Sequence, residues 1–145
     1  MRTKTVADLV RGWLPKAESD LTNAELCLDA GKALDTVCFH SQQAAEKFIK
    51  ACLIAHGIDF PFIHNLEKLI ELGAKHDPDF ISIESLGQEL TPYAVELRYD
   101  DEFWPAAATA SQALDAALTI GKSVMDRLPP EMGSEDERVQ VQNPS

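Results

Sequence analysis

Apolar residues recur at intervals of three and four along most of this chain, and each such stretch is followed by glycine or proline. The first set consists of Leu14, Ala17, Leu21, Ala24 and Leu28. This spacing predicts one apolar face of an α-helix, with Gly31 as its C-terminal stop. Pro15 suits the first turn of this helix. Residues 1–12 are therefore expected to form an N-terminal extension or a short separate helix.

The second predicted helix, from about Leu34 to His56, is the most apolar one, and Gly57 ends it. Its expected core stripe is Leu34, Val37, Ser41, Ala45, Phe48, Cys52 and Ala55. Apolar residues on more than one side predict burial by several neighbours, either inside a bundle or across a subunit interface. The loop that follows, residues 57–64, contains three large apolar side chains and is expected to pack on the rest of the protein.

Three further helices are predicted downstream. A short one follows Asn65, a favourable N-cap residue, and another begins between residues 82 and 85. The Thr91-Pro92 dipeptide is either the start of a new helix or a kink in a continuous one, and residues 93–99 are expected to be helical in both cases. The last helix begins at Pro105 and is closed by Pro129-Pro130.

This pattern predicts an all-α protein of five helices, most economically an up-and-down antiparallel bundle. The bundle is expected to span residues 13–128. Residues 129–145 carry several acids and no aromatic side chain, which is typical of a disordered acidic tail.

Charge and cysteine content exclude several classes of protein. The chain has 24 acidic residues against 13 Lys and Arg, a net charge of -11, so it lacks the basic surface needed to coat DNA, RNA or an anionic membrane. Three cysteines without a Cys-x-x-Cys spacing indicate neither a disulfide framework nor a zinc site. No apolar stretch approaches the ~20 residues of a membrane span, and no secretory signal is recognisable. A cytoplasmic protein is expected.

Metal and cofactor motifs are also absent from the sequence. No glutamate is followed by a histidine three residues later, and the four histidines form no pair at metal-ligand spacing. Glycine-rich phosphate loops and nucleophile elbows are missing as well. We therefore expect neither a metal site nor a cofactor.

Two groups of polar residues are candidates for function. Gln42, Glu46 and Lys50 are four residues apart and form one polar stripe on the second helix, which is either a solvated face or a polar surface facing a cleft or a partner subunit. Asp20 shares a helix face with apolar residues and is a candidate half-buried anchor for a cation.

Arg98 and Tyr99 stand together near the end of a predicted helix. Arginine binds phosphate or carboxylate through two parallel hydrogen bonds, and tyrosine stacks on nucleobases. The structural alternative is that Arg98 caps its helix or pairs with Asp20, Glu46 or Asp100.

Four segments together resemble the HEPN family, the higher eukaryotes and prokaryotes nucleotide-binding domain. They are residues 13–21, 38–51 and 64–66, and Arg98-Tyr99 with the helix that follows Pro105. The most diagnostic part is Phe-His-x-Gln-Gln-Ala-x-Glu-Lys-x-x-Lys, which begins at Phe39. The resemblance implies a bundle of four to five helices that commonly forms homodimers.

The resemblance also implies possible activities. Many HEPN proteins are toxins that cleave RNA without metal through an Arg-x(4–6)-His motif, often paired with a minimal nucleotidyltransferase as antitoxin. The window after Arg98 contains no histidine. It contains the acidic residues 100–102, which repel phosphate. A metal-free ribonuclease needs a group that titrates near neutrality, usually histidine.

The favoured hypothesis is therefore a dimeric binding module for a nucleotide, an RNA or a nucleotidyltransferase partner. Its candidate ligand-binding residues are Asp20, Gln42, Glu46, Lys50, Arg98 and Tyr99.

Two alternatives remain. A divergent metal-independent endoribonuclease would use Arg98 with His40 or His64 as the proton relay. A purely structural dimerisation protein would use Arg98, Asp20 and Glu46 as a buried ion network. Whether the chain is an enzyme stays open at this point.

Overall fold

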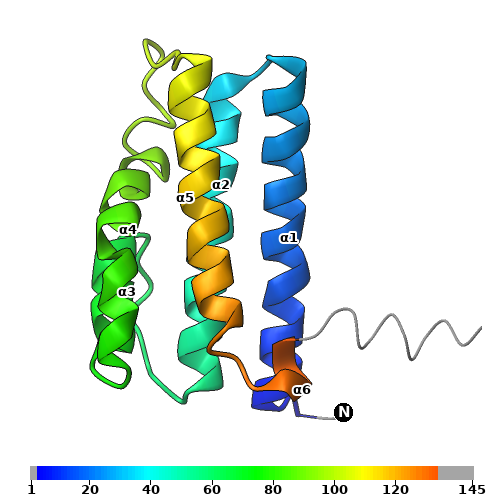
Figure 1. Cartoon of the computed structure of the whole chain (residues 1–145), viewed down its shortest axis with the longest axis vertical. Coiled ribbons are helices and arrows are strands. Elements are labelled where there is room, and N and C mark those ends of the chain that lie inside the picture. The colour runs from blue at the N-terminus through cyan, green and yellow to red at the C-terminus, as the bar shows by residue number, and fades with distance from the viewer. Residues whose placement is uncertain (1–2, 134–145) are drawn as a thin grey trace, which may run out of the picture.

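The computed structural model describes residues 3–133, which fold into an all-helical bundle. Its helices are α1 (Val6–Ala30), α2 (Leu34–Ala55), α3 (Leu66–Ala74), α4 (Glu84–Leu90), α5 (Ala107–Met125) and α6 (Pro130–Gly133), with 3-10 turns η1 (Pro78–Ile83) and η2 (Thr91–Tyr93). Figure 1 shows α1, α2 and α5 as long rods side by side, with α3 and α4 stacked beside them on the side away from α1. The predicted helical bundle is confirmed. No helix in the described part of the chain is long and apolar enough to cross a membrane.

Helix α1 begins seven residues upstream of Trp13, so residues 6–12 form no separate element. Thr5 and Asp8 form a capping box, in which each side chain accepts a hydrogen bond from the other residue's backbone N–H. Pro15 consequently lies inside the helix, not in its first turn, and that prediction is wrong. Val10 and Leu14, in the turn before Pro15, are buried in the core.

Helix α2 is the central element, because it packs against α1, α5 and α3. Gly31 and Gly57, with φ angles of 66° and 68°, end α1 and follow α2 as the sequence predicts. Close packing of α2 on α5 depends on Gly121, since a Cβ atom there would lie 2.9 Å from the ring of the buried Phe48.

The segment between α4 and α5 differs from the sequence prediction. Helix α4 ends at Leu90, and residues 94–99 form successive turns where a helix was expected. Thr91 does not cap a new helix: its hydroxyl donates to the carbonyl of Gly87 and accepts from the backbone N–H of Leu66. Helix α5 begins at Ala107, two residues after Pro105. Residues 94–106, which we call the connector, therefore lie outside regular helix.

Two other predictions need qualification. In the loop before α3, Ile58 and Phe60 pack against the core, but the side chain of Phe62 is 91% exposed. Asn65 caps α3 as expected, accepting a hydrogen bond from the backbone N–H of Lys68. Residues 130–133 form α6, and the rest of the expected tail lies outside the described residues.

Candidate functional site

The predicted polar stripe of α2 is a buried cluster centred on Glu46. Its Oε2 atom lies 3.0 Å from Nζ of Lys50, and its Oε1 atom lies 2.9 Å from Nδ1 of His64. Nε2 of Gln42 donates to the same Oε1 atom at 3.0 Å. The side chains of Glu46 and Lys50 are only 7% and 4% exposed, so the interpretation as a solvated face is wrong.

Gln42 ties the loop before α3 onto α2. The residue is fully buried, and its Nε2 atom also lies 3.3 Å from the carbonyl oxygen of His64. The rings of Phe60 and Phe62 lie over the Lys50 ammonium, with centroids 5.9 and 5.2 Å from Nζ. Gln42, Glu46 and Lys50 thus bind one another and this loop within the protomer.

Asp20 organises a second cluster between α1 and α2. Its Oδ1 atom lies 2.8 Å from Nδ1 of His40, and its Oδ2 atom accepts a short hydrogen bond from Nζ of Lys47. The carboxylate is 9% exposed, whereas His40 and Lys47 are about one quarter exposed. The second ring nitrogen of His40, Nε2, has no hydrogen bond to any residue in the range 3–133.

Arg98 joins neither cluster. Its guanidinium carbon lies 3.9 Å from the ring centroid of Phe39 on α2, and 5.8 Å from that of Tyr99. Across residues 3–133, Arg98 forms no ion pair with Asp20, Glu46 or any other acid, and it caps no helix. The alternatives that pair Arg98 with an acid, including the ion network, are therefore not formed in this structure.

The structure separates the two histidines proposed as a proton relay. His40 lies beside Phe39, with ring centroids 5.2 Å apart in an edge-on arrangement, so Phe39 contacts both His40 and Arg98. His64 instead belongs to the Glu46 cluster. Of the two, only His40 shares a neighbour with Arg98.

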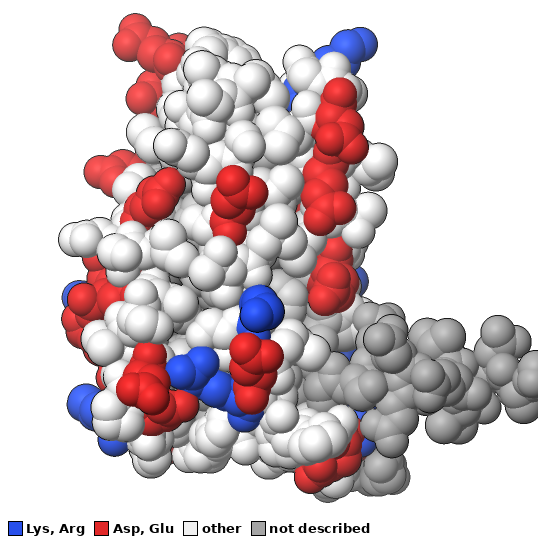
Figure 2. All heavy atoms as spheres, viewed as in Figure 1, with Lys and Arg blue, Asp and Glu red and all other residues white. Residues whose placement is uncertain are grey.

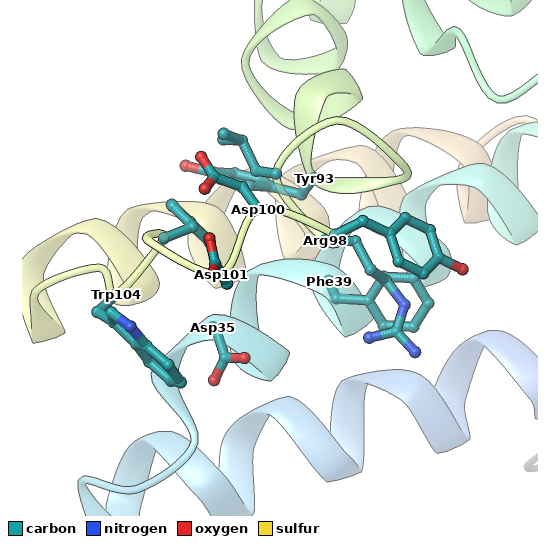
Figure 3. A pocket seen from close by; sticks show the side chains of 10 residues that line it. Asp35, Phe39, Tyr93, Arg98, Asp100, Asp101 and Trp104 are labelled. Atoms are coloured by element: carbon teal, nitrogen blue, oxygen red, sulfur yellow. The ribbon is translucent and has the colours of Figure 1, made fainter.

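A pocket of about 340 Å³ opens next to Arg98, between the beginning of α2 and the connector. It is lined by Asp35, Phe39, Tyr93, Leu97, Arg98, Tyr99, Asp100, Asp101, Phe103 and Trp104. In Figure 3, Arg98 lies over Phe39 on one side of the pocket, and Asp35, Asp101 and Trp104 gather on the other. This pocket was not predicted from the sequence, in which the aromatic residues between 99 and 104 were the available signal.

The wall of the pocket is held by a buried contact between Tyr93 and Cys38. Burial raises the pKa of the Cys38 thiol from 9.0 to about 11, although its hydrogen bond with Tyr93 lowers it. Burial likewise raises the pKa of Tyr93 to about 12. Both groups are protonated at neutral pH, so they serve as structural contacts between α2 and η2.

No group of three or more His, Cys, Asp or Glu side chains is placed to hold a metal ion in the part of the chain that the structure describes. Figure 2 shows acidic side chains spread over the face formed by α1, α5 and α4, with most of its basic side chains gathered in the lower half. Arg98 is thus an exposed cation in a predominantly acidic protein.

The fold defines a small helical-bundle domain. A family model described as "HEPN domain" matches residues 10–127, and the chain belongs to this family. The crystal structure of an archaeal HEPN homologue is similar, with a TM-score of 0.68 and 25% sequence identity over 83% of this chain and 98% of that chain. No curated protein sequence matches this one.

Proposed function

We propose that this HEPN protein is a dimeric binding module that presents Arg98 to the phosphate of a nucleotide or an RNA. The observation that carries the proposal is the state of Arg98, which is exposed and has no acidic partner within residues 3–133. A guanidinium without an acidic partner offers its N–H donors to phosphate in a bidentate arrangement. Phe39 holds the group in place, and the 78% exposed ring of Tyr99 is available to stack on a base.

The dimer part of the proposal is supported by two exposed aromatic side chains. Phe62 lies over Lys50, and Tyr99 lies beside Arg98, whose guanidinium stacks on Phe39. Phe39 and Lys50 are three helical turns apart on α2 and so face the same way. Exposed aromatics at both ends of one helix face are typical anchors of a protein interface. We favour a second copy of this chain as the partner that covers this face of α2, and a nucleotidyltransferase is the alternative partner.

The oligomer is tested by sedimentation of the full chain over a range of concentrations. We expect a dimer, and we expect Phe62→Ala to shift it toward monomer. Leu118→Ala is the control, because Leu118 is an exposed apolar residue on α5 and not on the proposed interface along α2. A monomer at all concentrations would contradict the dimer while leaving the phosphate contact to be judged separately.

The phosphate contact is tested by titrating AMP, ATP and a short 5′-phosphorylated RNA into the protein. Loss of a charge-assisted hydrogen-bond pair predicts affinity weakened at least tenfold in Arg98→Ala, or roughly 1.5–3 kcal/mol. Lys16→Ala, an exposed cation on α1, should leave affinity unchanged. Absence of binding, or equal affinity in Arg98→Ala, would reject this function.

A second candidate, a metal-independent endoribonuclease, is favoured by the pairing of Asp20 with His40. Asp20 orients the imidazole through Nδ1, which leaves Nε2 free to move a proton. Arg98 would stabilise the charge that develops on the phosphate in the transition state. In this arrangement His40, from α2, takes the place of the histidine that is missing after Arg98.

Cleavage of end-labelled RNA in EDTA distinguishes this candidate. If the protein is a ribonuclease, the wild type cleaves, Arg98→Ala and His40→Gln do not, and His64→Gln does. If the wild type leaves the RNA intact, the ribonuclease is rejected and the binding module remains.

A further inference from the structure

The pocket beside Arg98 has a second end with a different chemical character. Asp35 comes from the first turn of α2, Asp101 from the connector, and Trp104 lies next to both in Figure 3. Neither carboxylate forms an ion pair or a hydrogen bond with another residue in the range 3–133. Arg98, the one cation among the lining residues, is stacked on Phe39 instead.

The walls of this pocket are aromatic. Five of its ten lining residues carry phenyl, phenol or indole rings, and Trp104 is 75% exposed despite its size. The rings of Tyr93 and Phe103 lie side by side in this lining, with centroids 5.7 Å apart and planes tilted by 34°. Faces of aromatic rings attract cations, and they also cover the methylene groups of a bound ligand.

The combination selects one chemical class of ligand. Phosphate is disfavoured at this end because Asp35, Asp100 and Asp101 repel it. A metal ion is disfavoured because the described residues include no ligand set for one, and the rings offer no lone pairs to it. An organic cation satisfies both features, since its charged end pairs with carboxylates and its carbon chain packs on the rings.

We propose that this pocket binds a small alkylammonium ligand, such as a linear polyamine. The ammonium groups pair with Asp35 and Asp101, and the methylene chain lies along Trp104 and Phe103. The volume of about 340 Å³ is within the range of small-molecule sites, ~300–1,000 Å³. The ammonium groups lie at the opposite end of the pocket from Arg98, which lines the same pocket and repels them.

Calorimetric titration of the full chain with spermidine at fixed ionic strength tests the proposal. We expect saturable binding of one spermidine per protomer. Asp35→Asn and Asp101→Asn should each weaken spermidine affinity about fivefold, which is the change expected when one partly exposed ion pair is lost. Trp104→Ala should weaken it as well. Arg98→Ala should strengthen it, because that substitution removes a like charge from the pocket.

Two controls separate a built site from general attraction to an acidic protein. Asp115→Asn changes an exposed acid that lines a groove between α4 and α5 with no aromatic residue, and it should leave spermidine affinity unchanged. Magnesium at the same ionic strength should not compete. Equal weakening by Asp115→Asn, or equal binding of magnesium, would overturn the proposal.

A fluorescence readout keeps the test independent of calorimetry. In a Trp13→Phe background, Trp104 is the only tryptophan. Its emission should change as spermidine is added, and the midpoint of this change should equal the midpoint of the calorimetric titration. Asp101 lies in an exposed turn, so Asp101→Asn tests the site even if Asp35→Asn disturbs the start of α2. No saturable change up to millimolar spermidine would also overturn the proposal.

Discussion

In the middle of α2, Nζ of Lys50 lies 3.0 Å from Oε2 of Glu46, and neither side chain is more than 7% exposed. Burial of such a pair costs desolvation energy, which the structure offsets by giving Glu46 further hydrogen bonds from Gln42 and His64. The pair is stable only when complete, because a single buried charge has no water to solvate it.

Glu46→Gln should therefore lower the free energy of unfolding by about 3–5 kcal/mol, since it leaves the Lys50 ammonium buried without its counter-ion. Urea denaturation measures the loss, and Glu25→Gln, at an exposed position of α1, should change stability by less than about 0.5 kcal/mol. The double variant Glu46→Met, Lys50→Met should recover most of the loss. A double variant as unstable as the single one would show that hydrogen bonds, not the buried charge, dominate.

Gly121→Ala should destabilise the protein by about 1–3 kcal/mol, because the new Cβ atom would lie 2.9 Å from the Phe48 ring. The better helix propensity of alanine, about 1 kcal/mol, offsets only part of this. Gly12→Ala is the matched control: this glycine is in α1 with nothing within 4 Å, so alanine should stabilise there. Thermal melts decide the matter, and a rise in Tm for both variants would refute close packing at Gly121.

Ala33→Gly should stabilise the protein by about 0.5 kcal/mol. Ala33, just before α2, has a φ of 52°, a left-handed conformation that strains a residue with a Cβ by roughly 1–2 kcal/mol. The greater freedom of glycine in the unfolded chain removes about 0.4–1 kcal/mol of that gain. The measurement is the urea concentration at the midpoint of unfolding, compared between variants whose unfolding free energy has the same dependence on urea. A lower midpoint for Ala33→Gly would mean that the backbone at residue 33 is unstrained.

Stability should decrease at high pH. Burial raises the pKa of Cys38 and of Cys52 from 9.0 to about 11, so the folded state retains protons that the unfolded state releases. The stabilisation is complete below pH 9 and is lost as the pH rises from 9 toward 11. Urea denaturation at pH 7.5, 9.5 and 10.5 measures the decrease in the free energy of unfolding. Cys52→Ala should reduce the slope of this decrease with pH. An unchanged slope in that variant would exclude its thiol as a source.

The helices of the bundle could be predicted from the sequence because their signals are local. The apolar spacing and Gly57 place α2 within one residue of its observed C-terminus. The start of α1 was misjudged because Pro15 was assigned to a first turn and the Thr5–Asp8 capping box upstream was not recognised. Residues 94–99 were misjudged because their turns are held by contacts with other parts of the fold, such as that of Arg98 with Phe39.

The candidate site was less predictable, since its partners are distant in the sequence. Helical spacing aligned Gln42, Glu46 and Lys50, but it gave no sign that the loop carrying His64 covers them. Asp20 was identified as a candidate, yet its pairing with His40 requires the packing of α1 on α2. The assignment of ligands to these residues stays a prediction that binding measurements must test.

The connector, residues 94–106, gives this domain a way to acquire new specificity. Helix α2 is the core of the bundle and carries residues of both polar clusters, so most substitutions in it disturb folding. The connector supplies most of the pocket lining while burying only Ala94. Its length and sequence can therefore diverge between relatives, or be randomised in a library, while the bundle remains a constant scaffold beneath it.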